Sequence, residues 1–406
     1  MSVAAQILKK ELVSKASDIT VFDKSHLHYY QPGFTMLSGG LLGSNEEDIE
    51  RACSKYCTSQ WLKLITSSGK AFTYDYLVMA CGNQLRFDLI EGATEALEDP
   101  ESPVGSMYNL AYAKKINRLR ENFKGGKIVA TQPSMPIKCG GAPQKWVYLC
   151  EESMRKKKIR NSCDIHFYTA LPQMFPVKKY SDALYRIVTE KNIVPHFEYE
   201  AKKIDSKNKK VYFKKISQQP QEDTLLEVPY DLLHLVPLQK PLPCVAKAAF
   251  SNQAGYVDVH KHTLQSVKFD NVFALGDCSS LPTSKTAAAV FAQSPVLVCN
   301  LQNTMILHKN KNAKVEVKEL YDGYTSCPIF VGDNKLMLAE FLYDGKISET
   351  FSSFVDQSKP TQFFYYLKRY VFPYVYWHHV PRAQWFGRNT VVAPSFFRGR
   401  KGVHFS

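Results

Sequence analysis

The sequence predicts an α/β protein built from parallel, doubly wound sheets. Apolar strands alternate with helical segments along most of the 406 residues, and two of these strands, near 125–133 and 271–275, run into a glycine turn that is followed by a helix. Alternating strands and helices favour parallel sheets, because a parallel connection has to cross the sheet. Two strand–glycine–helix units predict two such domains.

Composition narrows the class further. The chain is 45% hydrophobic and has 52 Lys and Arg against 38 Asp and Glu, so its net charge of +14 should attract anions. No nucleic-acid reader motif accompanies the basic residues, and we expect no nucleic-acid partner. No run of 18 apolar residues is present, so we expect no membrane span. The ten cysteines are irregularly spaced, and Cys53 and Cys57 form neither a CxxC motif nor part of a metal site.

In the first part of the chain, residues 1–15 have the pattern of an amphipathic helix, and 18–25 that of a strand with Asp23 near its end. A carboxylate at the end of such a strand binds the adenosine ribose in dinucleotide-binding folds. A surface Asp that caps a turn is the alternative. Residues 74–85, "YDYLVMACGNQL", predict a buried strand that enters a turn at Gly82.

The middle of the chain repeats the strand–helix pattern. Strands are expected at 125–133, 163–170, 211–216 and 230–238, with helices from the turn after 133 to about Arg155 and over 181–193. The basic run 155–158 is interpreted as a solvated helix end.

The segment "NVFALGDC", 271–278, is an apolar strand that ends in Gly276 and Asp277 and precedes a small-residue helix near Thr286. Two-domain flavoproteins hold the ribityl chain of the flavin in this way. Asp277 would accept hydrogen bonds from ribityl hydroxyls, and the positive end of the helix dipole would favour the reduced flavin.

The turn "PIKCGGAPQK", 136–145, has a cysteine where a second dinucleotide-binding loop would have G-x-G-x-x-G. A thiol and a proline disturb the close approach of a pyrophosphate, so we expect no nicotinamide here. Cys139 near a helix N-terminus, with Lys138 and Lys145 beside it, should have a lowered pKa and act as a nucleophile. Inert packing is the alternative for a lone cysteine. Cys327, in a predicted turn before the strand "NKLMLAEF", is the second candidate.

The C-terminal region is crowded with aromatic residues. The stretch 362–379, "QFFYYLKRYVFPYVYWHH", includes Lys368 and Arg369, and "FFRGRK" follows at 396–401. Aromatic and cationic side chains together are typical of a helix that lies in the plane of a membrane surface. A C-terminal helix packed on the core is the alternative.

These blocks resemble sulfide:quinone oxidoreductase of the eukaryotic mitochondrial type. The similarity extends over essentially the whole chain and rests on "PIKCGGAPQK", "NVFALGDCSSLPTSKTAAAVFAQS", "YDGYTSCPIF" and "LAEF" followed by "DQSK". The resemblance implies that Cys139 and Cys327 are the redox pair and that Lys145 and Lys368 lie near the sulfur-acceptor site. It also implies these FAD contacts: Asp23, Gln31, Gly82, Gly276, Asp277, Lys285 and Ala287.

The resemblance further implies a two-dinucleotide-binding-domain flavoprotein. Its FAD domain would comprise 1–115 and 255–312, its second Rossmann-like domain 116–254, and its C-terminal membrane- and quinone-associating region 313–406. Hydrogen sulfide would be oxidised through a cysteine bridge and FAD, with Cys327 carrying the persulfide and Cys139 facing the flavin. Electrons would pass to ubiquinone, and sulfane sulfur to glutathione or sulfite. The location would be the mitochondrial inner membrane, with peripheral association.

The sequence departs from the family pattern in two places. Family members begin with a strand and a G-x-G-x-x-G loop, whereas this sequence starts at what looks like the following helix, and about a dozen family residues are absent between 44 and 64. We expect either an incomplete form of a normal enzyme or a short relative with impaired FAD binding. A type II NADH:quinone reductase and a non-catalytic, membrane-associated protein remain alternatives.

Overall fold

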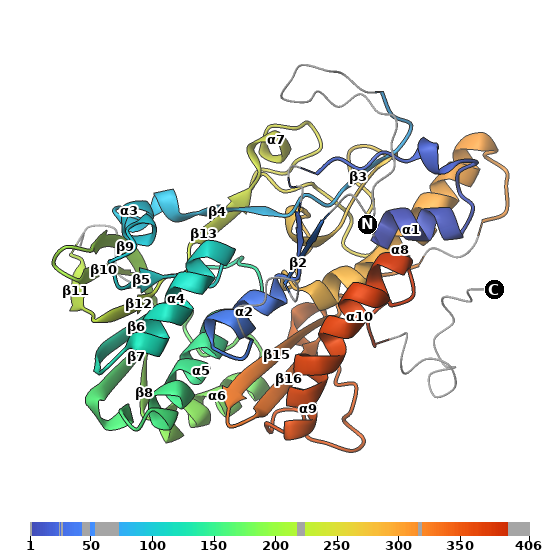
Figure 1. The fold of residues 1–406 in the computed structure, drawn as a ribbon. Helices are drawn as coiled ribbons and strands as arrows, with labels where there is room; N and C mark the ends of the chain where they lie inside the picture. The colour runs from blue at the N-terminus through green and yellow to red at the C-terminus, as the bar shows by residue number, and fades with distance from the viewer. Residues whose placement is uncertain are drawn as a thin grey trace.

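A computed structural model describes residues 2–23, 25, 27–42, 49–52, 73–216, 224–315 and 319–388. Figure 1 shows a sheet domain on the left, and long helices with a β-hairpin on the right. Cys53, Cys57, the segment between 52 and 73 and the basic end of the tail after 388 lie outside the described residues.

The larger sheet is fully parallel, as the alternation of strands and helices predicts. Its order is β5–β12–β6–β7–β8. These strands are β5 (Val104–Gly105), β12 (Leu232–His234), β6 (Gly126–Gln132), β7 (Cys163–Thr169) and β8 (Ile193–Phe197). The central strands are apolar and buried, as expected for a parallel sheet that is covered on both sides.

Helices cover one face of this sheet and a small antiparallel sheet covers the other (Figure 1). The helices are α4 (Leu110–Asn122), α5 (Ala142–Lys156) and α6 (Lys178–Glu190). The second layer consists of α3 (Ala93–Glu98), β9 (Tyr199–Asp205), β10 (Lys210–Lys215) and β11 (Leu226–Pro229). The basic run 155–158 lies at the C-terminal end of α5, as interpreted from the sequence.

A second parallel pair holds the other strand–turn–helix unit. Strand β3 (Leu77–Met79) pairs with β14 (Val272–Ala274), and α8 (Ala287–Lys309) follows β14. The N-terminal helix α1 (Ser2–Lys9) packs on α8 and is shorter than the predicted 1–15. Two antiparallel strands, β4 (Asn83–Arg86) and β13 (Leu238–Pro241), run between this part and the larger sheet, and α7 (Pro243–Ala246) follows them.

The predicted strand over 18–25 is wrong. Residues 19–23 have no regular structure, and Asp23 lies in an exposed loop where its carboxylate accepts a hydrogen bond from the Ser25 amide at 2.9 Å. Among the described residues no strand runs beside this segment, and strand backbone is stabilised only when a neighbour satisfies its hydrogen bonds. The next strand is β1 (Leu27–Tyr29), which pairs with β2 (Glu50–Ala52), and α2 (Pro32–Ser38) follows β1.

The C-terminal part is a β-hairpin covered by helices. Strand β15 (Thr325–Gly332) pairs with β16 (Lys335–Phe341), and α9 (Gln362–Tyr366), a π-helical turn (Leu367–Val371) and α10 (Phe372–His378) follow. Cys327 therefore lies inside a strand, and the turn predicted for it is wrong, because its partner Ala339 continues the ladder past it. The π-helical turn contains Lys368, and such turns often occur at functional sites.

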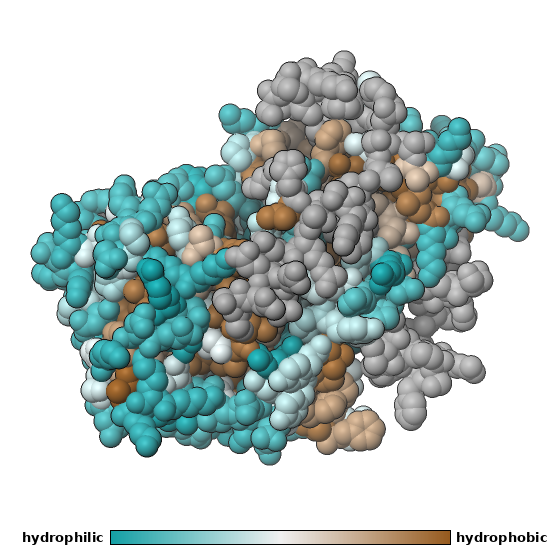
Figure 2. Space-filling model, viewed as in Figure 1, coloured by the Kyte–Doolittle hydropathy of each residue, from teal (hydrophilic) through white to brown (hydrophobic). Residues whose placement is uncertain are grey.

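The aromatic tail divides its side chains between the core and the surface. Phe364, Tyr365 and Trp377 are buried, whereas Phe363, Tyr366 and Tyr370 are half-exposed or more. Figure 2 shows apolar residues gathered at the lower right, where Figure 1 places α9. None of the helices in the described residues is both long and apolar enough to span a bilayer.

Candidate active site

Two sulfur atoms from distant parts of the chain meet beside α5. The Sγ atoms of Cys139 and Cys327 are 3.4 Å apart although the residues are separated by 188 positions. Cys139 lies in the turn between β6 and α5, and Cys327 lies on β15, which packs against α5. The structure thus brings the two predicted redox cysteines together as thiols in contact.

The glycines of the C-G-G turn explain why the sulfurs can approach. A Cβ atom on Gly141 would lie 2.7 Å from the Cys327 Sγ, which is closer than carbon and sulfur can pack. Cys139 itself has a φ of +48°, a left-handed conformation that non-glycine residues adopt only when their surroundings hold them there. Its amide donates to the Lys285 carbonyl at 2.7 Å, and its carbonyl accepts from the Ala142 amide at 2.7 Å.

The surroundings favour a thiolate on Cys139. The hydrogen bond from the Cys327 thiol and the Lys145 ammonium, whose Nζ lies 3.2 Å from the Cys139 Sγ, lower the pKa of Cys139 well below its ordinary value. The same contact and burial raise the pKa of Cys327. Of the pair, Cys139 is therefore the better leaving group and Cys327 the thiol that keeps its proton.

Two buried lysines flank the sulfurs. Burial disfavours the charge of Lys145, but the neighbouring Cys139 and Cys327 sulfurs outweigh it and raise the pKa of Lys145. For Lys368 the two sulfurs do not outweigh burial. Burial together with the charge of Lys145 lowers the pKa of Lys368 to about 7. The Lys368 ammonium donates to the Tyr30 hydroxyl at 3.1 Å. Lys368 can therefore gain or lose a proton near neutral pH.

A large cavity opens in front of the sulfur pair. Its volume is about 2390 Å³, well above the roughly 300–1,000 Å³ of a typical small-ligand pocket. It is long enough to reach from the β3–β14 pair to the C-terminal helices. Most of the residues predicted for the site line it: Asp23, Gln31, Gly82, Cys139, Lys145, Asp277, Lys285, Ala287 and Lys368. Cys327 does not line it, but its sulfur contacts that of Cys139, and Gly276 is adjacent to the lining residue Asp277.

The Gly-Asp turn and the start of α8 form one wall of the cavity. Burial raises the pKa of Asp277, and the Lys138 and Lys285 charges oppose that rise. Gly276 adopts a φ of +69° and its amide donates to the Gln293 side chain. Ala287 is the first residue of α8, which Thr286 caps by accepting from the Ala289 amide. The helix therefore begins at the cavity, as predicted.

Two of the predicted cofactor residues also bind protein groups. The Lys285 ammonium donates to the Ser279 carbonyl at 2.6 Å and lies 5.0 Å from the centre of the Tyr256 ring. Gln31, at the start of α2, accepts from the Lys138 ammonium at 3.3 Å. The Lys285 carbonyl, which accepts from the Cys139 amide, ties the two strand–turn–helix units together, and Gln31 orients a cation in the cavity.

The residues present fit the flavin end of FAD. Gly82 has a φ of +70° and no heavy atom within 4 Å of the position of a Cβ, so a planar group can approach it closely. The buried amide of Asn83, next to it, lines the cavity, and neither its oxygen nor its nitrogen has a hydrogen-bond partner among the described residues. A ligand with donors and acceptors would satisfy that amide. The sequence contains no G-x-G-x-x-G loop for a pyrophosphate.

Sequence reasoning missed several residues of the site. Lys138 was predicted only as a charge beside Cys139, and it lines the cavity near Asp277, where it donates to Gln31; Tyr30, which binds Lys368, was not predicted. The sequence could have indicated Lys138 as a site residue, because it directly precedes Cys139. Tyr30 carried no signal, since only folding places residue 30 beside residue 368.

Comparison with curated proteins shows the family. The chain is 40% identical over 406 residues to the mitochondrial sulfide:quinone oxidoreductase of Schizosaccharomyces pombe, an alignment that covers 95% of this chain and 86% of the relative. It is 38% identical to the protein of that name from Dictyostelium discoideum, over 97% of this chain and 86% of the relative. The chain belongs to the sulfide:quinone oxidoreductase family. No family model matches it.

Solved structures agree with this family at the level of the fold. The sulfide:quinone oxidoreductase of Aquifex aeolicus superposes with a TM-score of 0.69 at 19% identity, covering 97% of this chain and 90% of that one. NDH2 from Plasmodium falciparum superposes with a TM-score of 0.57 at 13% identity, covering 94% and 97%. Both support the predicted α/β architecture with parallel sheets.

Proposed function

We propose that this protein oxidises hydrogen sulfide, passes two electrons through FAD to ubiquinone and hands sulfane sulfur to a small acceptor such as glutathione or sulfite. The observation that carries the proposal is the pair of sulfurs, 3.4 Å apart, of which that of Cys139 lies at the wall of a cavity large enough for a cofactor and substrates. The names of three curated relatives, the mitochondrial sulfide:quinone oxidoreductases of Schizosaccharomyces pombe, Dictyostelium discoideum and Mus musculus, support the same reaction and a mitochondrial location.

The sulfur chemistry follows from the unequal thiols. Starting from an oxidised Cys139–Cys327 bridge, hydrosulfide attacks the Cys327 sulfur. A new S–S bond forms there, the bond to Cys139 breaks, and the electron pair of that bond stays on Cys139. The low pKa of Cys139 makes it the faster leaving group. Cys327 then carries the persulfide, and Cys139 the thiolate.

The spacing also suits a bridge with one additional sulfur. A direct S–S bond is about 2.05 Å long, shorter than the observed 3.4 Å. Two such bonds joined at a near-tetrahedral angle span about 3.3 Å. The turn and β15 thus hold the sulfurs at a distance that a sulfur-extended bridge would occupy without movement of the backbone.

Cationic side chains would bring the anionic reactants to the sulfurs. Lys138, Lys145, Lys285 and Lys368 all line the cavity. Lys145 remains charged beside Cys139 and would attract hydrosulfide, sulfite or the carboxylates of glutathione. Lys368, with a pKa of about 7, would take up the proton that hydrogen sulfide loses and return it to a leaving thiolate.

FAD, when bound, would accept the two electrons from the Cys139 thiolate and release them to a quinone. Asp277, Gly82 and Asn83 would hold its polar chain and ring edge, and the start of α8 would favour its reduced, anionic form. Asp23 and Gln31, which also line the cavity, would be further contacts.

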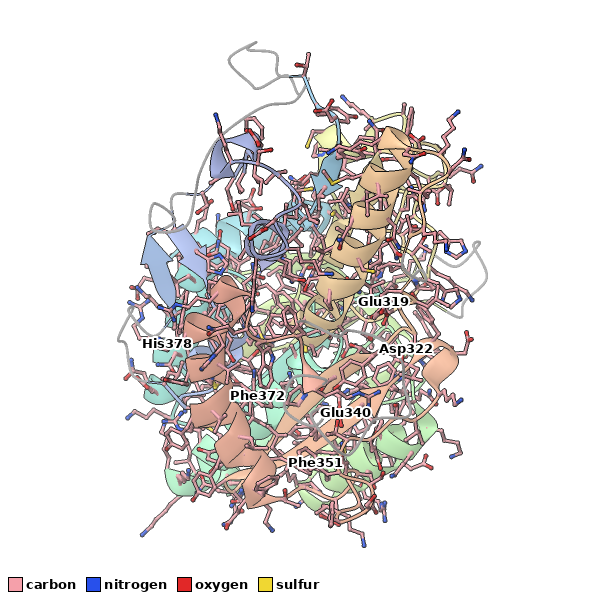
Figure 3. The ribbon with its side chains drawn as sticks, turned by 90° about the vertical axis from the view of Figure 1, so that its right-hand side faces the viewer. Glu319, Asp322, Glu340, Phe351, Phe372 and His378 are labelled. Carbon is pink, nitrogen blue, oxygen red and sulfur yellow. The ribbon has the colours of Figure 1, made fainter. Side chains whose placement is uncertain are left out.

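Ubiquinone would reach the cavity from a membrane surface. Phe363, Val371 and Phe372 line the cavity at the C-terminal helices, and Figure 3 shows the labelled Phe372 between these helices and α8. Phe363 is 53% exposed and Tyr370 is 59% exposed, so the same helices present aromatic rings outward. Rings and nearby cations such as Arg369 would rest peripherally on the inner membrane.

The decisive experiment is a flavin absorbance spectrum of the purified protein before and after addition of sodium sulfide. We expect a bound flavin that sulfide bleaches and that decylubiquinone restores, and a long-wavelength thiolate-to-flavin band that Cys139→Ser removes. A protein without flavin, or one whose flavin is bleached by NADH and not by sulfide, contradicts the proposal. The first result would favour a form with impaired FAD binding, and the second an NADH:quinone reductase.

A further inference from the structure

A histidine and a tyrosine form a hydrogen-bonded pair on the cavity wall, apart from the sulfur chemistry. The Nε2 of His28, on β1, lies 2.7 Å from the hydroxyl of Tyr376, on α10. The two rings are stacked, with centroids 5.8 Å apart and planes within 4°. Both residues line the cavity, and neither takes part in the steps described above.

The pair lies where the aromatic C-terminal helices meet the start of α8. The Tyr376 ring is 4.6 Å from the Tyr30 ring and 6.3 Å from the ring of Phe291, which is in the first turns of α8. Tyr30 in turn accepts the hydrogen bond from Lys368. An apolar, planar ligand that reaches the α8 terminus between these rings would therefore have its polar edge near the Tyr376 hydroxyl.

The protonation states suit proton donation. Burial lowers the pKa of His28, and the Asp23 carboxylate opposes that effect. Burial raises the pKa of Tyr376, so its hydroxyl keeps its proton at neutral pH. The second group within reach of that hydroxyl is the Tyr29 carbonyl at 3.4 Å, a weak acceptor. In the tautomer with the proton on Nε2, His28 donates to Tyr376, and the Tyr376 proton can turn to a stronger acceptor without loss of a good bond.

We propose that Tyr376 and His28 supply a proton to the quinone during its reduction, which deepens the proposed function and rests on it. Reduction of a quinone to a quinol takes two electrons and two protons. Reduced FAD, when bound, would supply the two electrons and one of the protons. For the second proton, the Tyr376 O–H bond breaks as a new O–H bond forms on the quinone oxygen. His28 then gives its Nε2 proton to Tyr376 while its Nδ1 takes up a proton from solvent, so the partly exposed imidazole stays neutral throughout.

The kinetic test separates the two halves of the reaction in Tyr376→Phe and His28→Gln, each purified with flavin. We expect sulfide to reduce the flavin at the wild-type rate within about twofold, and decylubiquinone to reoxidise it at least about 100-fold more slowly, the usual effect of losing a general acid. Tyr185→Phe, an exposed tyrosine on α6, is the matched control and should change neither phase. His28→Gln keeps a hydrogen-bonding side chain and tests the pair if Tyr376→Phe folds poorly.

A second readout does not depend on catalysis. In protein labelled at histidine, decylubiquinone should shift the imidazole signal of His28, identified by its loss in His28→Gln, and should shift it less in Tyr376→Phe. Reoxidation at the control rate in both variants, or an unmoved His28 signal, overturns the proton-supply role while the proposed function stands. Failure of the wild type to be reduced by sulfide or reoxidised by quinone overturns the proposed function instead.

Discussion

The two strand–turn–helix units, β6–α5 and β14–α8, share a local fold and differ in what the turn presents to the cavity. The first presents the Cys139 thiol, and the second the Asp277 carboxylate. The Cys139 amide donates to the Lys285 carbonyl, so the two turns are bonded to each other. Under the proposed function, the helix N-terminus is a shared scaffold, and the side chain in the turn would decide between a nucleophile and a cofactor contact.

The largest expected effect is the loss of either sulfur. Cys139→Ser and Cys327→Ser should each lower the rate of sulfide oxidation by about a thousandfold or more, because a serine hydroxyl cannot form or break the sulfur–sulfur bridge. The flavin-to-protein ratio should remain that of the wild type, because the β14–α8 turn is intact. Steady-state turnover and flavin absorbance measure the two quantities.

Cys163→Ser is the control for the loss of a thiol, since Cys163 is buried, donates to the Ile159 carbonyl and does not line the cavity. Loss of both flavin and activity in Cys139→Ser would contradict the assignment of the nucleophile to one turn and of the flavin contact to the other.

The next prediction concerns the second turn, whose carboxylate Asp277→Ala removes. We expect flavin to bind about 10- to 100-fold more weakly, because hydrogen bonds to a charged group contribute about 1.5–3 kcal/mol. Alkylation of Cys139 by iodoacetamide in the flavin-free protein should change by less than about threefold, the spread expected for a neighbouring charge that is partly screened. Titration with FAD and peptide mass analysis provide the measurements. Asp182→Ala, an exposed carboxylate paired with Lys178, should bind flavin normally.

A smaller change tests the close approach within the first turn. Gly141→Ala should lower sulfide oxidation about tenfold, because a methyl group at that position meets the Cys327 sulfur and forces β15 away. Gly140→Ala is the matched control: its Cβ would meet only the flexible end of Met135, at 3.0 Å. Equal activities of the two variants would mean that the sulfurs tolerate a wider separation.

The smallest effect concerns the charge beside Cys139. In the reduced protein the pKa of Cys139 is lowered, so Cys139 remains a thiolate at pH values below the ordinary pKa of a cysteine. Lys145 contributes to that lowering. Lys145→Met should therefore move the pH midpoint of Cys139 alkylation upward by about one unit and leave the rate at pH values well above the midpoint unchanged. The exposed Lys178→Met should leave the midpoint in place. A downward movement would contradict the assigned electrostatics.

Local patterns predicted much of the fold. The apolar strands β6, β7 and β14 and the helices α5, α6 and α8 form close to their expected positions, because each has either a continuous apolar run or an apolar face that folding buries. The strand expected at 18–25 and the turn expected at Cys327 are wrong for a common reason. Whether extended residues become a strand depends on a partner elsewhere in the chain, which a local pattern does not contain.

The sequence by itself determined which chemistry is present: the thiols, the Gly-Asp turn, the lysines and the aromatic tail are all visible as residues. Only the tertiary structure decided which of them act together. It brought the Cys327 sulfur into contact with the Cys139 sulfur, and it formed the hydrogen bonds between Lys368 and Tyr30 and between His28 and Tyr376. These contacts join residues that are far apart in the chain, and their pKa shifts arise from burial and from neighbours that exist only after folding.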